Sequence, residues 1–504
     1  MKRFLFLIIT IVGLLTVPQS CGKDYLELYP NEAVSAADVF TTTKNAWGAI
    51  NGIHRLLYQQ GSWAGRGGDM DQCGQSGLMI HNDHMGDDLV LHVNQWFMGS
   101  QRWQPHVNPN SSQVWHRYRF YYQVIVNANI IIKNIDGAVG PAAERDAIKG
   151  QALAYRAWAH FELVQFYADR FDWTRPSNDQ LGVPLMVTVT SEPQPRATVQ
   201  AVYTQIRQDL TDAIALLDGK VVPNNSHLSV AVARGLRARV ALATGEWTVA
   251  ASMANAARAG RTLLTHAQLM SGFNNRALPE AMWASHVILD HTTFFHSFFA
   301  FMSFNFSSTN IRSAPKRINA LLFNQISPTD VRRQWFEATA AGARTRLNAA
   351  GLPTTYVAAN HHSFKFQAVS AADSRGDVIY MRVAEMFLIE AEALARANQF
   401  GPAATVLHQL ISTRDPNYTL STNTGQALID EIMRHRRIEL WGEGFRFQDL
   451  KRTNSALDRT GATGFTAATH VILSYPAGGS RWTSLFPQDE VNANPLLVQN
   501  VHID

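Results

Sequence analysis

Apolar residues recur at three- and four-residue steps through much of this chain, which is the spacing of one face of an α-helix. Residues 147–169 show the pattern clearly, with Leu153 and Phe161 on the same face. Residues 198–217 repeat it, and Thr198 is well placed to cap the start of that helix. The pattern predicts a predominantly all-α fold.

Two segments that lie far apart in the sequence resemble each other. Residues 238–252 can be laid on residues 391–405, because each has a helix of small residues that ends at Gly245 or Asn398. In both segments an aromatic residue follows two positions later, and an Ala-Ala pair then begins a second helix. Gly and Asn favour the left-handed turn that joins paired helices. We therefore expect a tetratricopeptide-like scaffold of helix pairs that carries large insertions.

The insertions have a different composition. Residues 61–114 and 279–313 mix Gly, Asn, Trp, Phe and His with little helical period, and their aromatic content argues against disorder. The sequence predicts that they are long, irregular, aromatic-rich loops. Residues 417–424 and 452–481 are also predicted to be loops.

The first residues have the layout of a secretion signal. Lys2 and Arg3 precede an apolar run of residues 4–17, which is too short to span a bilayer as a helix. Cys21 follows directly, as the lipidated cysteine of a bacterial lipoprotein does, although Pro18 is unusual in such a signal. We expect a signal peptide over residues 1–20 and a lipid anchor on Cys21, with plain secretion as the alternative.

Composition and charge narrow the function. The chain has 504 residues, of which 46% are hydrophobic and 17% charged, and this is ordinary globular composition. Removing Lys2 and Arg3 with the signal lowers the formal net charge from +4 to +2, which argues against nucleic acid as a partner. If Cys21 carries lipid, Cys73 has no disulfide partner and is expected to be a buried, inert thiol.

Six segments, in order along nearly the whole chain, carry a resemblance to a known family. They are residues 21–30, 121–129, 150–163, 382–393, 432–452 and 486–495. In this set, residues 432–452 are the most distinctive, because Glu439, Glu443, Arg446 and Asp449 follow the spacing of a C-terminal signature. The chain resembles the SusD/RagB outer-membrane nutrient-binding lipoproteins.

This resemblance implies a body over residues 21–504, with a tetratricopeptide-like N-terminal part (about 21–275) and a RagB/SusD-type C-terminal part (276–504). It also implies a lipoprotein at the cell surface on the outer membrane. Its expected partner is a SusC-type, TonB-dependent outer-membrane transporter. Its expected ligand is an oligosaccharide or polysaccharide, with peptide as a less favoured ligand.

The charged run in residues 431–451 could suggest catalysis, since glycoside hydrolysis uses two carboxylates. Glu439 and Glu443 alternate with arginines at helical spacing, and a paired carboxylate has its pKa lowered, which is wrong for a general acid. We therefore expect structural ion pairs here and no enzyme activity. A surface-anchored glycoside hydrolase or metal hydrolase is the alternative, and an adhesion or assembly role is a third.

Residues 81–88 are the strongest metal candidate, because His81, Asp83, His84, Asp87 and Asp88 lie close together in what looks like a turn-rich segment. No distant third ligand can be named, so neither a metal nor a cofactor is expected. No nucleotide-binding or nucleophile motif is present in the sequence.

The aromatic insertions supply the candidate ligand residues. Sugars bind with their C–H faces on Trp or Tyr rings, while neighbouring amides and guanidiniums bond the hydroxyl groups. No motif fixes single positions, and any one of these rings can instead pack in the core. The candidates are Trp63, Arg66, Asn94, Trp96, Arg102 and Trp103 in the first insertion, and Trp283, Phe295 and His296 in the second.

Overall fold

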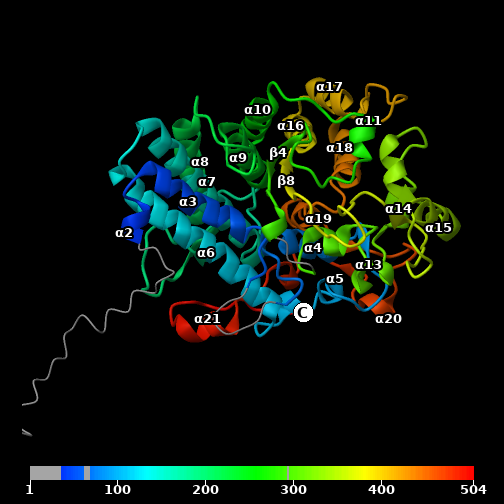
Figure 1. Ribbon diagram of the computed structural model, residues 1–504, viewed down its shortest axis with the longest axis horizontal. Helices are drawn as coiled ribbons and strands as arrows, with labels where there is room; N and C mark the ends of the chain where they lie inside the picture. Colours follow the sequence, from blue (N-terminus) through cyan, green and yellow to red (C-terminus); the bar gives the residue numbers. More distant parts are fainter. Residues whose placement is uncertain (1–35, 62–68, 292–294, 504) are drawn as a thin grey trace, which may run out of the picture.

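The computed structural model describes residues 36–61, 69–291 and 295–503, and this part of the chain is predominantly helical (Figure 1). The fold class expected from the sequence is therefore confirmed. The longer helices are α3 (Thr43–Leu56), α4 (Gly74–Met85), α6 (Ser112–Asn134), α7 (Ala142–Tyr167), α8 (Val199–Leu217), α9 (Val230–Thr244), α10 (Trp247–Arg258), α15 (Ala340–Ala349), α16 (Val383–Arg396), α17 (Phe400–Ile411) and α18 (Gly425–Glu439). The shorter ones are α2 (Ala36–Val39), α5 (Met98–Gln101), α11 (His266–Leu269), α12 (Phe298–Met302), α13 (Thr309–Arg312), α14 (Ala320–Phe323), α19 (Arg446–Arg452), α20 (Ala467–His470) and α21 (Gln488–Ala493).

Neighbouring helices form an array that crosses the molecule in Figure 1, from α3 and α6 on the left to α17 and α18 at the upper right. Along it, α6 packs on α7, α7 on α8, α8 on α9, and α9 on α10. The array continues from α10 to α16 and then to α17 and α18. Helices from both sides of residue 275 therefore pack side by side in one array.

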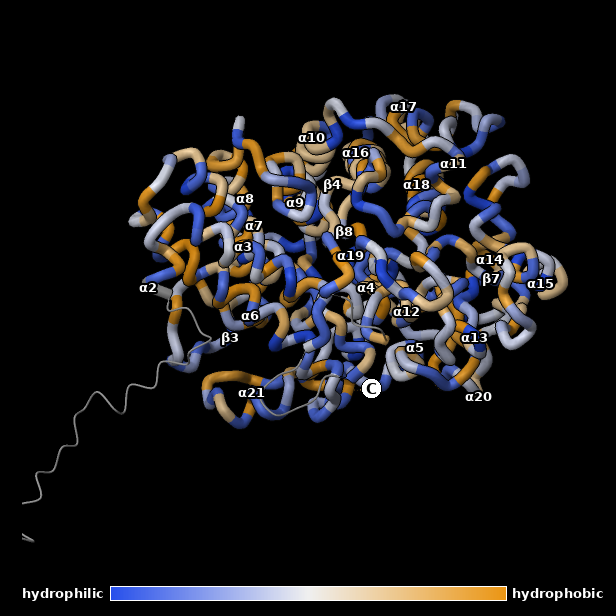
Figure 2. Tube along the Cα trace, in the orientation of Figure 1, coloured by the Kyte–Doolittle hydropathy of each residue, from blue (hydrophilic) through white to orange (hydrophobic). Residues whose placement is uncertain are grey.

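The two repeat-like segments correspond to the helix pairs α9–α10 and α16–α17. Gly245 ends α9 with φ of 76°, and Asn398 follows α16 with φ of 60°, so both adopt the left-handed conformation expected from the sequence. The hydroxyl of Thr198 accepts the backbone N–H of Ala201 at 3.1 Å, which confirms the predicted cap of α8. Most helices of the array contain both hydrophobic and hydrophilic residues (Figure 2), as is typical of amphipathic helices with one buried face.

The strands are short and antiparallel. One sheet has the order β1 (Leu89–Val90), β5 (Arg317–Ile318), β7 (His362–Ser363), β6 (Phe336–Glu337). Three further pairs are β2 (Leu181–Pro184) with β3 (Arg196–Thr198), β4 (Ala281–Ala284) with β8 (Ile379–Arg382), and β9 (Leu457–Asp458) with β10 (Ser474–Tyr475). The pairing of β4 with β8 attaches the second insertion to the start of α16.

The insertions are more ordered than the sequence indicated. The first contains α4, whose residues are all buried, and the second contains β4 and α12. The prediction of irregular loops was wrong for α4 because every side of this helix is covered by protein. A helix buried all round has no polar face, and here the buried positions hold His, Asn and Asp as well as Leu and Ile.

Cys21 and the expected signal peptide lie outside the described residues, as do Trp63 and Arg66. Within the described residues, no helix has both the length and the apolar composition needed to cross a membrane.

Candidate ligand-binding surface

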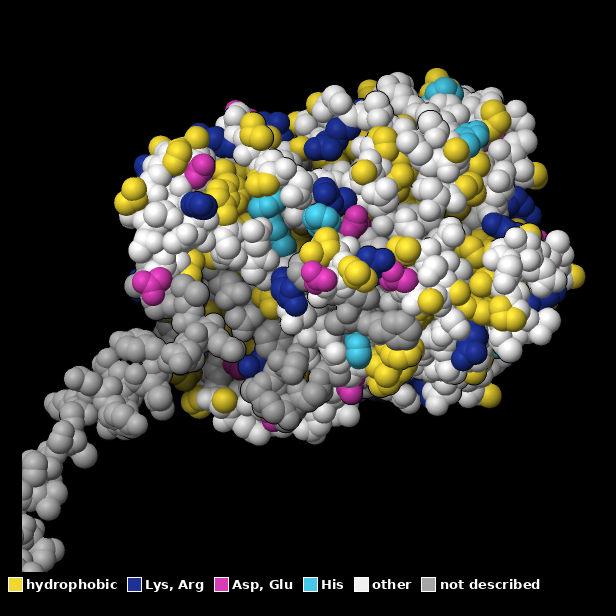
Figure 3. All heavy atoms as spheres, viewed as in Figure 1, with side chains coloured by type: hydrophobic (Ala, Val, Ile, Leu, Met, Phe, Trp, Pro, Cys, Tyr) yellow, Lys and Arg dark blue, Asp and Glu magenta, His cyan; other side chains and the backbone are white. Residues whose placement is uncertain are grey.

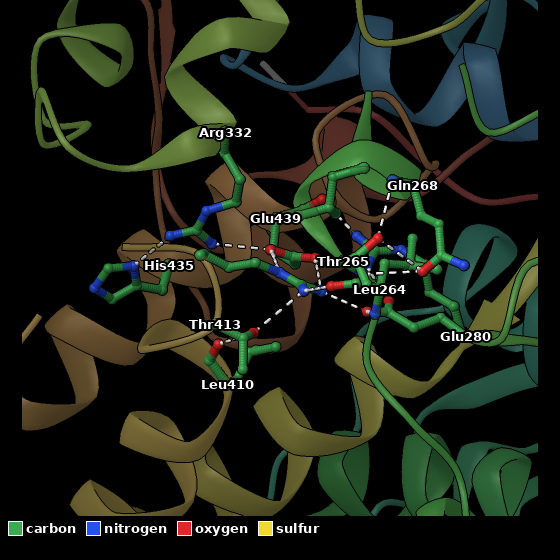
Figure 4. A network of polar contacts seen from close by, with 12 residues as sticks. Leu264, Thr265, Gln268, Glu280, Arg332, Leu410, Thr413, His435 and Glu439 are labelled. Atoms are coloured by element: carbon green, nitrogen blue, oxygen red, sulfur yellow. Dashed lines mark hydrogen bonds and ion pairs between the residues drawn. The ribbon is translucent and has the colours of Figure 1, made fainter. Parts of the chain in front are cut away.

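Glu439 and Glu443, the central carboxylates of the charged run, are buried among basic side chains, and Figure 4 shows Glu439 beside Arg332. Glu439 Oε1 lies 2.6 Å from Arg382 Nη1 and 3.1 Å from Arg414 Nη2, and its Oε2 lies 3.0 Å from Arg332 Nη1. Glu443 pairs with Arg382 at 2.8 Å and with Lys365 at 2.6 Å. These partners come from β8, from the 3-10 helix at Val331–Trp335 and from loops.

The expectation of structural ion pairs therefore fits the geometry, but the expected partners were wrong for the two central glutamates. Their cations come from distant parts of the chain and not from helical neighbours three or four residues away. The surrounding cations outweigh the cost of burial and hold the pKa values of Glu439 and Glu443 below the usual glutamate value. Carboxylates in this state remain ionised and cannot donate a proton as a general acid.

Residues 81–88 lie on α4 and just after it, and not in a turn-rich segment as the sequence suggested. Asp87 accepts hydrogen bonds from Arg446 and Asp88 from Arg437, each at 2.5 Å in its shortest contact. His81 Nδ1 lies 2.7 Å from Ser100 Oγ. In the described part of the chain, no three His, Cys, Asp or Glu side chains are grouped so that they could hold a metal ion.

Cys73, just before α4, is fully buried, and burial raises the pKa of its thiol. A thiol in this state is protonated and unreactive, as the sequence predicted.

The two aromatic insertions meet beside α4. The rings of Phe97 and Phe301 pack at right angles with centroids 5.0 Å apart, and Gln95 donates a hydrogen bond to Ser313 at 3.3 Å. Strands β1 and β5 pair at the same junction. The structure thus joins two segments that are separated by about 200 residues of sequence. Helices α5 and α12 contact α4, and α13 contacts α12. Helices α4, α5 and α13 lie close together in Figure 1.

The candidate residues divide into exposed and buried groups. Trp96 is 37% exposed and Asn94 is also exposed, so both reach the surface at the junction. Phe295 is 38% exposed, and His296 is half-buried with its pKa lowered by desolvation. Arg102 is half-buried, and its Nε donates to the carbonyl of Thr469 at 2.7 Å.

Trp103 and Trp283 do not fit the role expected for them. Each is only 1% exposed and packs in the hydrophobic core. Trp103 Nε1 donates to the carbonyl of Met85 at 2.8 Å, and Trp283 packs edge-on against Trp158 at 5.3 Å. Neither ring offers a face to a ligand, because tertiary packing covers both.

The sequence did not predict two grooves that lie along helices of the array. One, of about 620 Å³, runs along α3, and the other, of about 430 Å³, runs along α6 beside Trp115, Tyr118 and Tyr122. No aromatic residue of α3 or α6 was named as a ligand candidate from the sequence, where all the candidates came from the two insertions. The polar residues among the aromatic ones, such as Asn51 and Arg55 on α3, were the available signal.

Two family models match the chain. One, described as "Starch-binding associating with outer membrane", matches residues 67–242, and the other, described as "SusD family", matches residues 332–502. Together these stretches make up more than half of the sequence. The chain belongs to the SusD/RagB family. The resemblance carried by the six sequence segments is thereby confirmed.

Relatives within the family are similar in sequence or in fold. A SusD-like protein of Formosa agariphila is 33% identical over 148 residues, which is 27% of this chain and 27% of that protein. A SusD-like carbohydrate-binding protein from Bacteroides vulgatus has the same fold, with a TM-score of 0.78, 24% identity and coverage of 91% of this chain and 98% of that one. A laminarin-binding SusD-like protein superposes with a TM-score of 0.69 at 19% identity, covering 92% and 99% of the two chains.

Proposed function

We propose that this SusD/RagB-family chain is a cell-surface, non-catalytic protein that captures a glycan through the exposed surface around Trp96. The observation that carries the proposal is the exposure of Trp96 and of Asn94, two positions earlier in the chain, at the junction of the two aromatic insertions. An exposed indole provides a flat apolar face for a sugar ring, and an amide beside it can bond hydroxyl groups. The descriptions of two structural relatives as carbohydrate-binding and laminarin-binding support this ligand class.

The proposal also includes attachment to the outer membrane by lipid and a transporter as the protein partner. Cys21, after the apolar run of residues 4–17, is the proposed lipid attachment point on the outer membrane. The proposed partner is a SusC-type, TonB-dependent transporter that receives the captured glycan. Both parts rest on the leader sequence and on family membership.

Trp63, Arg66, Phe295 and His296 remain proposed contributors to the same surface. The last two belong to the second insertion, whose Phe301 packs on Phe97 next to Trp96. Phe295 adds an apolar ring, so this side of the surface suits the less polar face of a sugar or a hydrophobic substituent.

The first experiment measures binding of laminarin and soluble starch by calorimetry. Trp96→Ala should weaken binding about tenfold or more, because loss of a central aromatic contact typically has this effect. Its melting temperature should stay within a few degrees of the parent, because Trp96 lies at the surface and outside the hydrophobic core. Trp173→Ala is the matched control, since this half-buried ring lies on a different element, between α7 and β2.

Unchanged affinity in Trp96→Ala would remove this residue from the site. Release of new reducing ends from either polysaccharide would instead favour the hydrolase alternative. Binding of peptides, with no binding across a broad glycan array, would overturn the proposed ligand class.

A further inference from the structure

The groove along α3 is separate from the surface around Trp96. Its volume is about 620 Å³, within the range of small-molecule sites. One wall is formed by side chains on one face of α3 and just after its C-terminal end. The other wall is formed by the loop between α8 and α9. The principal lining residues are Trp47, Asn51, His54 and Tyr58 on the first wall and Asn224 and His227 on the second. Histidine side chains gather on this face near α3 and α9 (Figure 3).

Aromatic rings meet edge to face inside the groove. The ring of His227 lies at 80° to that of Trp47, with centroids 5.3 Å apart, and at 89° to that of His54, with centroids 4.4 Å apart. Trp47 is only half-buried, so part of its ring remains accessible. Because the rings are perpendicular, a ligand in the groove would meet ring faces in two orientations.

The histidines bring ring nitrogens that make no hydrogen bond to the described part of the protein. Gln151 Oε1 accepts the backbone N–H of Leu228 at 3.1 Å and lies 3.2 Å from His227 Nδ1, so Nδ1 donates and Nε2 keeps its lone pair. His54 Nε2 is buried without a hydrogen-bond partner in the described part of the chain. A buried polar atom of this kind is costly unless a ligand or water satisfies it.

Both imidazoles are neutral near pH 7. Burial lowers the pKa of His227 to about 4, and burial and the neighbouring His227 lower that of His54 well below its usual value. A neutral imidazole has one donor and one acceptor, which matches a hydroxyl group.

The loop that forms the second wall is held in place. Asn224 Oδ1 accepts the backbone N–H of Ser226 at 2.8 Å, and Asn225 Nδ2 donates to the carbonyl of Arg276 at 2.6 Å. The backbone N–H of Ala284 also donates to the carbonyl of Asn225 at 3.0 Å. The groove is therefore preformed, which lowers the entropic cost of binding.

Gly52 lines the groove from the interior of α3, where glycine is less favourable than alanine. A Cβ placed there would meet no atom within 4 Å outside the backbone of α3 itself, among the residues that the structure describes, so packing against them does not require glycine at this position. A side chain would instead narrow the groove. Gly48, one turn earlier, is equally open to a Cβ but does not line the groove, and it offers a matched control.

The charge of the lining indicates the ligand class. Within the described residues, Arg55 is the only lysine, arginine, aspartate or glutamate that lines the groove. We propose that the α3 groove is a second saccharide site, which takes an uncharged sugar residue with one face on Trp47 and its hydroxyls on His54 and His227. This inference rests on the proposed glycan-binding function, and it adds a site built on different elements.

The test uses fluorine NMR of the full chain labelled with fluorotryptophan, with the spectra of Trp47→Phe and Trp96→Phe assigning the two resonances. The probes are laminarin oligosaccharides and malto-oligosaccharides. We expect the Trp47 resonance to shift saturably with at least one probe, and to shift equally in Trp96→Ala. Gly52→Ala should raise the melting temperature by about 1 °C but weaken binding at Trp47 about tenfold. Gly48→Ala should raise the melting temperature by a similar amount and leave the affinity measured at Trp47 unchanged.

The outcomes separate the two proposals. A shift of the Trp96 resonance without a shift of the Trp47 resonance would overturn the second site and leave the proposed function standing. A shift at Trp47 alone would support the groove and remove Trp96 from the site. No shift at either ring with any probe would overturn both. Equal binding by Gly52→Ala and Gly48→Ala would also contradict the assignment of the groove.

Discussion

Glu439 is bonded by three arginines that come from three distant parts of the chain. At the scale of single residues, the same arrangement recurs at other positions that carry the family resemblance. Arg156 pairs with Asp209 at 2.6 Å and donates to Asn129 at 2.9 Å. These side chains are buried, so each charge needs several well-placed partners to offset its loss of water. Glu439 and Arg156 therefore join elements of the fold that lie apart in the sequence.

Glu439→Gln should lower the free energy of unfolding by about 3 kcal/mol, because Arg332, Arg382 and Arg414 would keep their charges with fewer compensating groups. Chemical denaturation monitored by circular dichroism measures this loss. Glu192→Gln, at an exposed position, is the control and should change stability by less than about 0.5 kcal/mol. A loss of under about 1 kcal/mol in Glu439→Gln would show that the network does not stabilise the fold.

At the scale of elements, helix ends were easier to predict than buried helices. Thr198, Gly245 and Asn398 act through their own backbone geometry, so their roles can be assigned from local sequence. Helix α4 is buried on all sides, and its His81 and Asp83 gain their hydrogen-bond partners, Ser100 and the backbone N–H of Gly444, from outside the helix. Local sequence contains no signal for such a helix.

Gly245→Ala should lower the free energy of unfolding by about 1–2 kcal/mol or more, because a left-handed residue with a Cβ is strained. The added Cβ would also lie 2.5 Å from Cβ of Trp173. Thermal unfolding measures the effect. The equivalent turn provides the control, since Asn398→Gly keeps φ near 60° accessible and should leave the melting temperature unchanged or slightly higher. Equal losses in the two variants would contradict this account.

At the scale of the whole molecule, burial keeps many histidines neutral. Desolvation lowers the pKa values of His106, His116, His160 and His362 to about 3. His160 shows how the fold fixes the neutral form, because its Nδ1 lies 3.0 Å from the carbonyl of Arg156 and its Nε2 accepts the N–H of Met186 at 3.2 Å. Unfolding exposes these rings to water, where they titrate near pH 6.5.

Stability should therefore fall as the solution becomes acidic. The unfolded chain gains protons on these histidines below about pH 6.5, whereas the folded chain gains them only near pH 3, so their stabilising effect is complete above pH 6.5 and decreases below it. Each histidine contributes up to about 1.4 kcal/mol per pH unit. Asp71 and Asp83 partly offset this loss of stability, because burial raises their pKa values to about 6 and 7 and the folded chain therefore binds their protons at a higher pH than the unfolded chain does.

Urea unfolding at a series of pH values tests this expectation. The midpoint should decrease steadily between about pH 6.5 and 4.5, and His160→Gln should reduce the slope by about one proton. A midpoint that stays constant over this range would contradict the assignment of neutral buried histidines.

The sequence by itself determined the helical class, the left-handed turns of the helix pairs and the family. Helical period and turn chemistry are local properties of the chain, and the order of the motifs can be read along it without knowing how it folds. The tertiary structure decided that Trp103 and Trp283 belong to the core while Trp96 reaches the surface. It also decided which arginines neutralise Glu439, and it formed the α3 groove from helix and loop segments far apart in sequence. These outcomes depend on which distant segments cover a side chain, and exposure is a property of the packed molecule.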